Sequence, residues 1–401
     1  MGAETEFIPS GSVTSPEGFQ AGAVCAGIKK ANVLDLAILS SEVSCVTAGL
    51  FTTNRVKAAP VVFCQQQLRS GRVRAVVINS GCANACTGKQ GLADTVEMAG
   101  LAAGAVGASP EEILVASTGV IGQLLPMESL RAGMNQIALS KDGGHELARA
   151  IMTTDTVPKE VAVKVAGSEV IIGGAAKGAG MIHPDMATLL CFLTTDASVD
   201  LVFLKSALRR AADVSFNMIS IDGDTSTNDT VLLMASGLSG AEPISQGSRQ
   251  ADAFQQALNQ LCIHLAKAVA RDGEGATKLI EVAVNGAPGV GEARSVARTV
   301  VSSPLVKSAI HGNDPNWGRV LAAVGRSGVE VIEAKIDLYI GDICLVKAGH
   351  PLPFDEDVAV KTLDRSEVAI VVNLNLGNAS ATAWGCDLSE EYVTINSQYT
   401  T

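Results

Sequence analysis

Short apolar segments rich in Val and Ile alternate with segments of helical periodicity along most of the chain. This alternation constrains the fold more than any other feature. The predicted strands, each of which ends at a glycine, are 73–81, 113–122, 279–286 and 367–377. The predicted helices are 93–108, 129–140, 201–214 and 251–270. Mixed helices and strands, with several strands expected to be antiparallel, predict an α+β fold.

Composition indicates what fills the core. The 401-residue chain is 47% hydrophobic but only 3% aromatic, and it contains 40 glycines. Small and β-branched side chains must therefore form the core, and the glycines imply tight turns and close backbone approaches. Weak points for a domain boundary lie near 185–200 and 286–293. Because no long linker separates them, we expect one intimate globule.

The net charge of −11 excludes several classes of partner. Nucleic acid and anionic membrane surfaces both require a basic footprint, so we expect neither as a partner. No run of about 18 apolar residues is present, which predicts no membrane-spanning helix. The N-terminal segment resembles neither a signal peptide nor a transit peptide, so we expect a cytoplasmic protein.

Two motifs that suggest a metal site or a phosphate site each lack a residue that the site requires. Residues 222–233 have the oxygen spacing of a calcium loop but lack the required glycine and end on Leu233 rather than Glu. A hydrogen-bonded polar turn at the edge of an active site is the favoured interpretation. The Gly-rich segment 173–180 lacks the Lys-Ser/Thr of a P-loop. We therefore expect no metal and no organic cofactor.

Thr188 follows a Gly/Pro-rich turn and precedes an apolar run. Taken alone, it is a β-branched residue that starts a strand. The chemical alternative is a hydroxyl that attacks the preceding carbonyl, so that an N→O acyl shift and hydrolysis free the α-amine of Thr188. An N-terminal Thr carries nucleophile and base on one residue, and an α-amine titrates near ~7.7–8.0. Spacing alone leaves both interpretations open.

Several strings together resemble one family, the ornithine acetyltransferases (ArgJ) of arginine biosynthesis. The strings are FTTNRVKAAPV (51–61), INSGCANACTG (78–88), STGVIG (117–122), TTDTVPK (153–159), KGAGMIHPDMATLL (177–190), IDGDTSTND (221–229), DGEGATK (272–278), HGNDPNWGR (311–319) and AWGCDLSEEYVTINSQYTT (383–401). The combination is far more specific than any one string.

The resemblance implies an N-terminal-nucleophile-like fold, a layered sandwich of helices and sheets that cleaves itself between Ala187 and Thr188. The products would be an α chain, 1–187, and a β chain, 188–401, which assemble as two α and two β chains. The implied reaction is ping-pong transfer of acetyl from N²-acetyl-L-ornithine to L-glutamate, which gives L-ornithine and N-acetyl-L-glutamate. Some family members also take acetyl from acetyl-CoA, and no residue of this sequence decides that point.

Site residues carry over one at a time. Thr188 matches the nucleophile, and Thr118 and Gly119 match the pair that stabilises the oxyanion. The positions that match substrate contacts are Thr153 and Thr154 (with Thr153 preferred), Lys177, Thr188, Glu274, Asn396 and Thr401. We expect Lys177 to bind the α-carboxylate and Glu274 to bind the distant ammonium of ornithine.

Two alternatives from other classes remain at this stage. An N-terminal-nucleophile aminopeptidase or amidase would hand the acyl group to water instead of to glutamate. A non-enzymatic relative would keep the fold and bind amino acids without cleaving itself.

Overall fold

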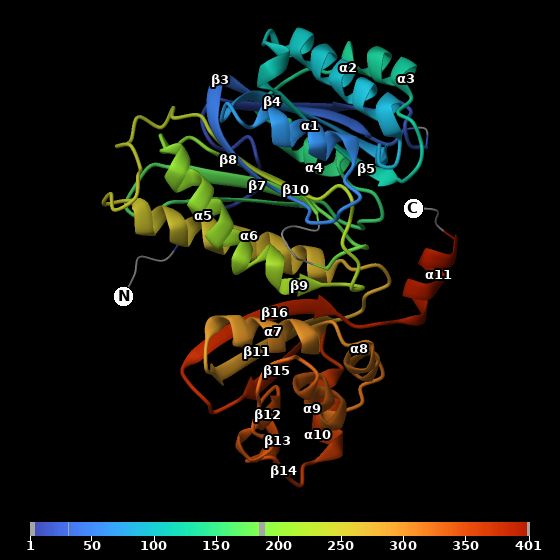
Figure 1. Cartoon of the computed structure of the whole chain (residues 1–401), viewed down its shortest axis with the longest axis vertical. Coiled ribbons are helices and arrows are strands. Elements are labelled where there is room, and N and C mark those ends of the chain that lie inside the picture. The colour runs from blue at the N-terminus through green and yellow to red at the C-terminus, as the bar shows by residue number, and fades with distance from the viewer. Residues whose placement is uncertain (1–4, 31, 184–188, 399–401) are drawn as a thin grey trace.

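A computed structural model describes residues 5–30, 32–183 and 189–398. Two sheets organise this part of the chain (Figure 1). The nine-stranded sheet contains β1 (Glu6–Ile8), β2 (Phe19–Val24), β3 (Leu36–Phe51), β4 (Arg72–Cys82), β5 (Ile113–Val120), β6 (Lys159–Lys164), β7 (Ile171–Lys177), β8 (Leu190–Thr195) and β10 (Thr230–Ala235). The seven-stranded sheet contains β9 (Ile219–Ser220), β11 (Leu279–Ala287), β12 (Asp337–Ile340), β13 (Ile343–Lys347), β14 (His350–Pro351), β15 (Glu367–Asn373) and β16 (Ala379–Cys386).

Helices cover the sheets in layers. The helices are α1 (Ala59–Gln67), α2 (Gly88–Val106), α3 (Met127–Met134), α4 (Gly144–Ala150), α5 (Leu201–Asp213), α6 (Ala251–Arg271), α7 (Val290–Val301), α8 (Pro304–His311), α9 (Trp317–Gly325), α10 (Glu356–Leu363) and α11 (Glu390–Gln398). Figure 1 shows α5 and α6 between the two sheets and α2 and α3 at the opposite end of the larger sheet. Short 3₁₀ turns occur at Pro110–Glu112, Phe216–Met218 and Glu333–Lys335.

Alternating side chains place the larger sheet between two cores. In β8, Cys191 and Leu193 belong to the core that contains α5, α6 and α7. Their neighbours Leu190 and Phe192 belong to the core that contains α1 to α4. Because side chains alternate along a strand, this fully apolar run buries both of its faces. The result is a layered α+β sandwich, as the sequence predicts.

The predicted elements agree with the structure with one clear exception. The predicted strands coincide with β4, β5, β11 and β15, and three predicted helices coincide with α2, α5 and α6. The predicted helix 129–140 is wrong beyond Met134, where α3 ends. Ser140 instead forms a β-bridge with Ala21, donating its N–H to the Ala21 carbonyl at 2.9 Å and accepting in return at 3.0 Å. Pairing of Ser140 with Ala21 therefore outweighs the helical spacing of residues 135–140.

The predicted chain boundary at 187/188 falls within the order of the larger sheet. β7 precedes it, β8 and β10 follow it, and β8 pairs with β7 while β10 pairs with β3. The larger sheet is thus built from residues on both sides of that point. None of the helices in the described ranges is long and apolar enough to span a bilayer.

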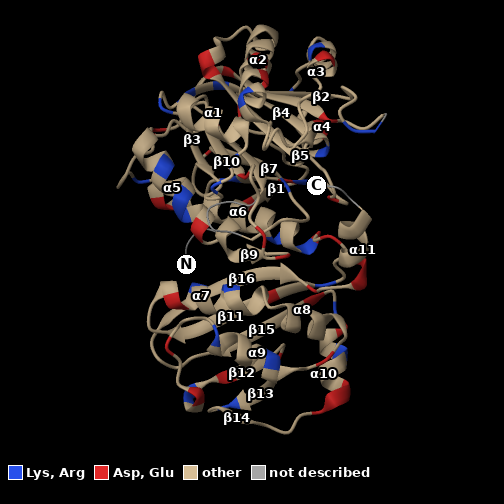
Figure 2. Cartoon of the chain, turned by 45° about the vertical axis from the view of Figure 1, so that its right-hand side comes forward, with Lys and Arg blue, Asp and Glu red and all other residues tan. Residues whose placement is uncertain are grey.

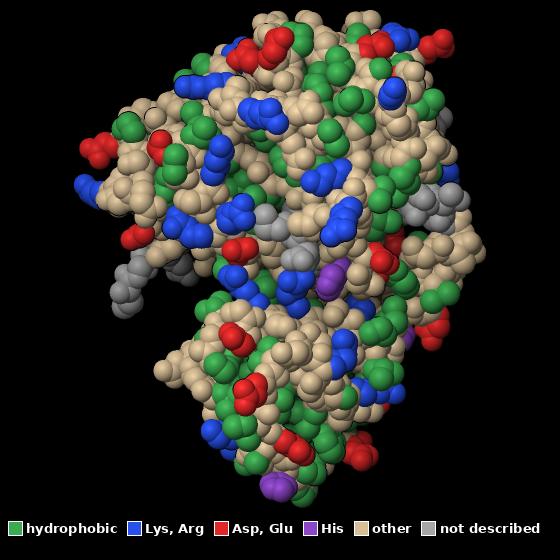
Figure 3. Space-filling view, viewed as in Figure 1, with side chains coloured by type: hydrophobic (Ala, Val, Ile, Leu, Met, Phe, Trp, Pro, Cys, Tyr) green, Lys and Arg blue, Asp and Glu red, His purple; other side chains and the backbone are tan. Residues whose placement is uncertain are grey.

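Charged side chains lie mainly outside the sheets. In Figure 2 the strands are mostly free of Lys, Arg, Asp and Glu colouring, which gathers on helices and loops. The face in Figure 3 intersperses both signs, so the net negative charge is not concentrated there.

Candidate active site

A polar pocket of about 250 Å³ gathers the family-matched residues. Its lining includes Thr118, Gly119, Thr153, Thr154, Lys177, Glu274 and Asn396. These seven come from separate parts of the sequence, and the fold brings all of them to one place. The remaining predicted site residues, Ala187, Thr188 and Thr401, lie outside the described residues.

Thr118 and Gly119 lie near the end of strand β5, where the pairing with β4 is irregular and no side chain is tolerated at Gly119; we call this pair the oxyanion turn. Gly119 has φ +127°, a backbone conformation that favours glycine. A Cβ there would lie 2.3 Å from the backbone carbonyl carbon of Gly81 on the neighbouring strand β4. Parallel pairing of Ser80 with Thr118 fixes the register of this approach. The glycine therefore lets the turn pack against β4 while Thr118 faces the pocket.

Lys177 ends β7 and points its ammonium at two hydroxyls. Its Nζ donates to Thr118 Oγ1 at 3.2 Å and to Thr153 Oγ1 at 2.8 Å. Lys177 is 8% exposed, so it is not a solvated surface charge. Burial lowers the pKa of Lys177, and the nearby Asp155 carboxylate partly offsets that effect.

Asp155 is the buried counter-charge of this part of the pocket. Its carboxylate accepts from the Lys159 ammonium at 2.6 Å, from Gly178 N at 2.6 Å and from Thr153 N at 3.0 Å. Burial alone would raise the pKa of Asp155, but the Lys177 and Lys159 ammoniums outweigh it and hold the pKa at about 2. Asp155 therefore stays ionised, holds the backbone of Thr153 in place and balances the charge of Lys177.

Glu274 lies on the loop after α6 and faces α11 across the pocket. It is 8% exposed, and its Oε2 accepts from Asn396 Nδ2 at 2.8 Å. Its backbone N–H donates to the carbonyl of Ala179 at 2.8 Å. A Cβ on Gly180 would lie 2.5 Å from the Glu274 carboxyl carbon, so the glycine makes room for the carboxylate.

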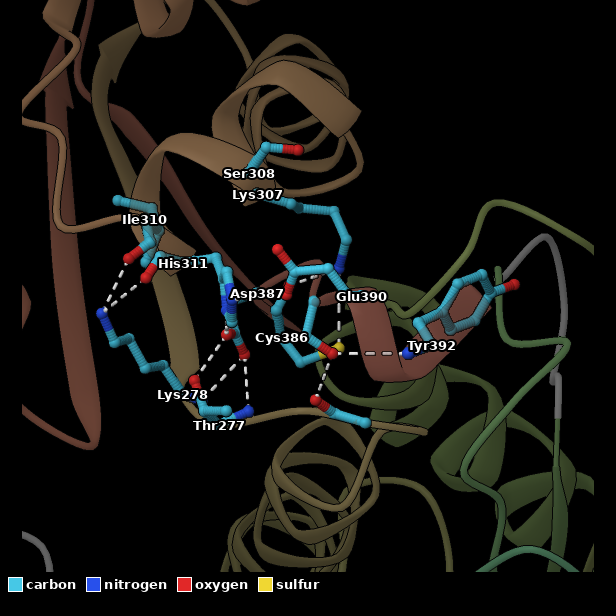
Figure 4. Close-up of polar contacts among 12 residues, drawn as sticks. Thr277, Lys278, Lys307, Ser308, Ile310, His311, Cys386, Asp387, Glu390 and Tyr392 are labelled. Carbon is cyan, nitrogen blue, oxygen red and sulfur yellow. Dashed lines mark hydrogen bonds and ion pairs between the residues drawn. The ribbon is translucent and has the colours of Figure 1, made fainter. Parts of the chain in front are cut away.

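A polar cluster next to the pocket fixes the loop of Glu274 and the start of α11 (Figure 4). Asp387 accepts from Thr277 N at 2.8 Å, Thr277 Oγ1 at 2.6 Å, Lys278 N at 2.8 Å and His311 Nδ1 at 2.7 Å. Burial would raise the pKa of Asp387, but the hydrogen bonds from Thr277 and His311 lower it. His311 Nε2 lies 3.3 Å from Glu390 Oε2 at the first turn of α11.

The 222–229 segment forms the polar turn that the sequence predicts at the site's edge. Asp222 accepts from Met181 N at 2.6 Å and from Ile182 N at 2.9 Å. Asp222, Asp224 and Tyr392 line the pocket but were absent from the predicted site residues. The two aspartates lie in the string 221–229 and Tyr392 lies in the string 383–401, so the sequence indicated their segments without assigning a role to any of the three. Tyr392 lies on α11 four residues before Asn396.

A second cavity of about 30 Å³ adjoins the first. It shares Thr118 and Lys177 with the pocket and adds Leu189 and Asp229 to its lining. Burial raises the pKa of Asp229 well above its ordinary value. The oxyanion turn and Lys177 therefore share this cavity with Leu189, the first described residue of the predicted β chain.

The arrangement suits a zwitterionic amino acid. The pocket is lined by the Lys177 ammonium and by the carboxyl groups of Glu274, Asp222 and Asp224, so it offers partners for both charges of such a ligand. A Thr-Gly turn beside the start of β8 can donate hydrogen bonds to a developing oxyanion.

Comparison with known proteins identifies the family of the chain. The model of the ArgJ family matches residues 20–401. The arginine biosynthesis bifunctional protein ArgJ of Dehalococcoides mccartyi is 52% identical over 405 residues and covers 100% of both chains. Its counterpart in Symbiobacterium thermophilum is 54% identical and covers 98% of this chain and 99% of its own. A crystal structure of ArgJ from Bacillus halodurans, 49% identical, superposes with a TM-score of 0.51 over 52% of this chain and 98% of its own. The chain belongs to the ArgJ family.

Proposed function

We propose that this chain transfers acetyl from N²-acetyl-L-ornithine to L-glutamate, with Thr188 as the acetyl carrier. The observation that carries the proposal is the convergence of Thr118, Lys177, Glu274 and Asn396 on one pocket beside Leu189. Membership of the ArgJ family indicates which reaction to expect. The pocket supplies the hydroxyl, ammonium and carboxyl groups that this reaction needs.

The reaction divides into two acyl transfers. Thr188 Oγ attacks the acetyl carbonyl, the amide C–N bond breaks, and ornithine leaves after its nitrogen takes up a proton. The α-amine of glutamate then attacks the ester, forms N-acetylglutamate and returns the Thr188 hydroxyl. Each step passes through an oxyanion that the Thr118–Gly119 turn can stabilise. The acetyl group travels on Thr188, so the proposed cycle uses no metal and no organic cofactor.

We also propose that the chain cleaves itself between Ala187 and Thr188 and works in the cytoplasm as two α and two β chains. The Bacillus halodurans ArgJ chain supports the cleavage, since 98% of it matches only 52% of this chain. Pairing of β7 with β8 and of β3 with β10 would hold the two products together.

Acceptor exchange tests the reaction. The protein is incubated with acetylornithine and isotope-labelled glutamate, and the products are separated by mass spectrometry. We expect labelled N-acetylglutamate and stoichiometric ornithine. Free acetate that forms at the same rate without glutamate would instead indicate an amidase. Acetyl-CoA in place of acetylornithine tests the second donor in the same assay.

A further inference from the structure

We infer that Asn228 is a positioning residue for acetyl transfer. Its side-chain amide holds the backbone on both sides of the Thr118–Gly119 turn, and the backbone of Thr230, two positions later, anchors Leu189. The inference rests on the proposed role of Thr118 as an oxyanion donor. It adds a residue that neither the sequence motifs nor the family match had assigned a role.

The amide of Asn228 bridges the two backbone segments that make the oxyanion turn. Asn228 is 6% exposed, and its Nδ2 donates to the carbonyl of Ser117 at 2.8 Å and to the carbonyl of Ala83 at 2.6 Å. Ser117 directly precedes Thr118. Ala83 follows the Gly81–Cys82 backbone on which Gly119 packs, and Ala83 N donates to the Val120 carbonyl at 2.9 Å. One side chain therefore fixes both sides of the turn.

The hydrogen bonds of Asn228 set the orientation of its amide. Carbonyl oxygens only accept, so the atom that faces Ser117 and Ala83 must be the NH₂ group. Asn228 Oδ1 in turn accepts from Thr227 Oγ1 at 2.6 Å. Both amide hydrogens and the amide oxygen therefore already have protein partners. Although Asn228 lines the pocket, its effect on the reaction must pass through the turn.

The backbone that follows Asn228 is hydrogen-bonded to the segment that follows the predicted nucleophile, Thr188. Thr230 N donates to the Leu189 carbonyl at 2.9 Å. From Thr230 onward, β10 pairs in parallel with β8, beginning opposite Leu190. A single residue, Asp229, thus separates Asn228, which holds the oxyanion turn, from Thr230, which anchors Leu189. This short connection sets the distance between the donors and the nucleophile's strand.

Acyl transfer is sensitive to that distance. A misplacement of about 1 Å at a reacting centre can cost about 100-fold in rate. Loss of the Asn228 amide donor should therefore lower kcat, because the oxyanion forms only in the reaction. Ground-state binding depends on Lys177, Glu274 and Asn396, so KM should change little.

The test uses Asn228→Asp, which keeps the side-chain shape and removes the donating NH₂. Rates are expressed per mole of the 188–401 fragment, quantified by denaturing mass spectrometry. We expect kcat to fall about 10- to 100-fold, with KM for acetylornithine and for glutamate within about threefold of wild type. Asn228→Ala provides a second loss of the same donor if the aspartate variant does not fold.

A matched control is Asn84→Asp. Asn84 is fully buried, and its Nδ2 donates to the Gly91 carbonyl and to Thr95 Oγ1, both at 2.9 Å, on α2 rather than on the oxyanion turn. This control loses a buried amide donor without touching Ser117. We expect a lowered Tm and an unchanged kcat.

A double-mutant cycle with Thr118→Ala separates positioning from general damage. If Asn228 acts through Thr118, adding Asn228→Asp to Thr118→Ala costs at most a few-fold more, far less than the product of the single effects. Multiplicative losses in the cycle, or an Asn228→Asp kcat equal to that of Asn84→Asp, would overturn the inference. So would failure of both Asn228 variants to produce the fragment. An unaffected Thr118→Ala would instead refute the proposed oxyanion role itself.

Discussion

Lys177 and Thr118 make a hydrogen bond whose direction has a chemical consequence. An ammonium carries donors and no acceptor, so Lys177 Nζ must donate and Thr118 Oγ1 must accept in their 3.2 Å contact. The Thr118 hydroxyl hydrogen is left available for another acceptor. The Lys177 charge beside it favours a negative charge at that acceptor. Lys177 thus orients the Thr118 hydroxyl and favours negative charge next to it. It is also a candidate partner for the substrate carboxylate.

Replacing Thr118 tests the oxyanion turn. Thr118→Ala removes one donor, and loss of one such donor costs about 10²–10³ in kcat. Steady-state kinetics measure the loss, and circular dichroism that matches wild type shows that the fold survives. An unchanged kcat would remove Thr118 from the reaction.

Replacing Glu274 tests the assignment of charge in the pocket. Glu274→Gln should raise KM for acetylornithine much more than KM for glutamate, because glutamate offers no distant ammonium to lose its partner. Lys177→Met should weaken both substrates through their shared α-carboxylate. Equal effects of Glu274→Gln on the two KM values, each substrate varied separately, would refute the pairing and leave the nucleophile assignment intact.

Asp155 should make stability depend on pH in the acid range. Its pKa in the folded protein is about 2, below the ordinary value of 3.8, so its contribution is present above pH 3.8 and is lost as pH falls toward about 2. The linkage amounts to about 2 kcal/mol. Denaturant unfolding near pH 5 and near pH 2 should show wild type losing about that much more than Asp155→Asn. Parallel losses in the two proteins would contradict the assignment.

Site residues were predicted only at positions that the family resemblance marks as functional. Asn228 and Tyr392 were missed although they lie in the matched strings 221–229 and 383–401, because a distant contact gives each of them its role. Thr118, Lys177 and Glu274 lie in strings that matched the family. Tyr392 and Asn228 acquire their positions through α11 and through carbonyls at residues 83 and 117. A hydrogen bond that spans 145 residues leaves no local pattern in the sequence.

Helix α11 is an element held by polar contacts. Each of its residues is exposed or half-buried in the described structure, so apolar burial contributes little to its docking. Ser389 Oγ, just before the helix, donates to the Gly275 carbonyl at 2.6 Å, and Asn396 donates to Glu274. These contacts, together with the Asp387 cluster, set one wall of the pocket.

Asp387→Asn should loosen that wall. The substitution replaces one acceptor of a buried carboxylate with a donor facing Thr277 and His311, and an unsatisfied buried group costs about 1–3 kcal/mol. We expect faster amide hydrogen exchange in 390–398 and a raised KM for acetylornithine. Glu390→Gln, at an exposed pair worth about 0–1 kcal/mol, is the control and should change exchange little. Equal exchange in both variants would show that Asp387 does not anchor α11.

Elements were predictable where local periodicity and burial agree. Helix α6 was predicted from one apolar stripe, and five members of that stripe, Phe254, Leu258, Leu261, Leu265 and Val269, are fully buried. Helix α2 begins at Gly88, five residues before its predicted start, through glycines that local propensity disfavours. A Cβ on Gly91 would lie 1.9 Å from Thr87 Oγ1, so tight packing explains that glycine inside the helix.

At the scale of the whole molecule, the larger sheet joins the two predicted chains. β7 would be the last described strand of the first chain and β8 the first described strand of the second, with Lys177 paired opposite Leu190. The pocket takes Thr118 and Lys177 from the first chain and Glu274 and Asn396 from the second. Neither chain alone would contain the site, so the cut must leave the sheet intact for the enzyme to work.

The most direct test of the account is a denaturing mass spectrum of the purified protein before and after acetylornithine is added. We expect chains of 187 and 214 residues (401 − 187 = 214), the second beginning at Thr188 and becoming one acetyl group heavier at that residue. Added glutamate should restore the original mass, and Thr188→Ala should stay uncut. A single intact chain that still transfers acetyl, or an acetyl group on any other residue, would contradict the account.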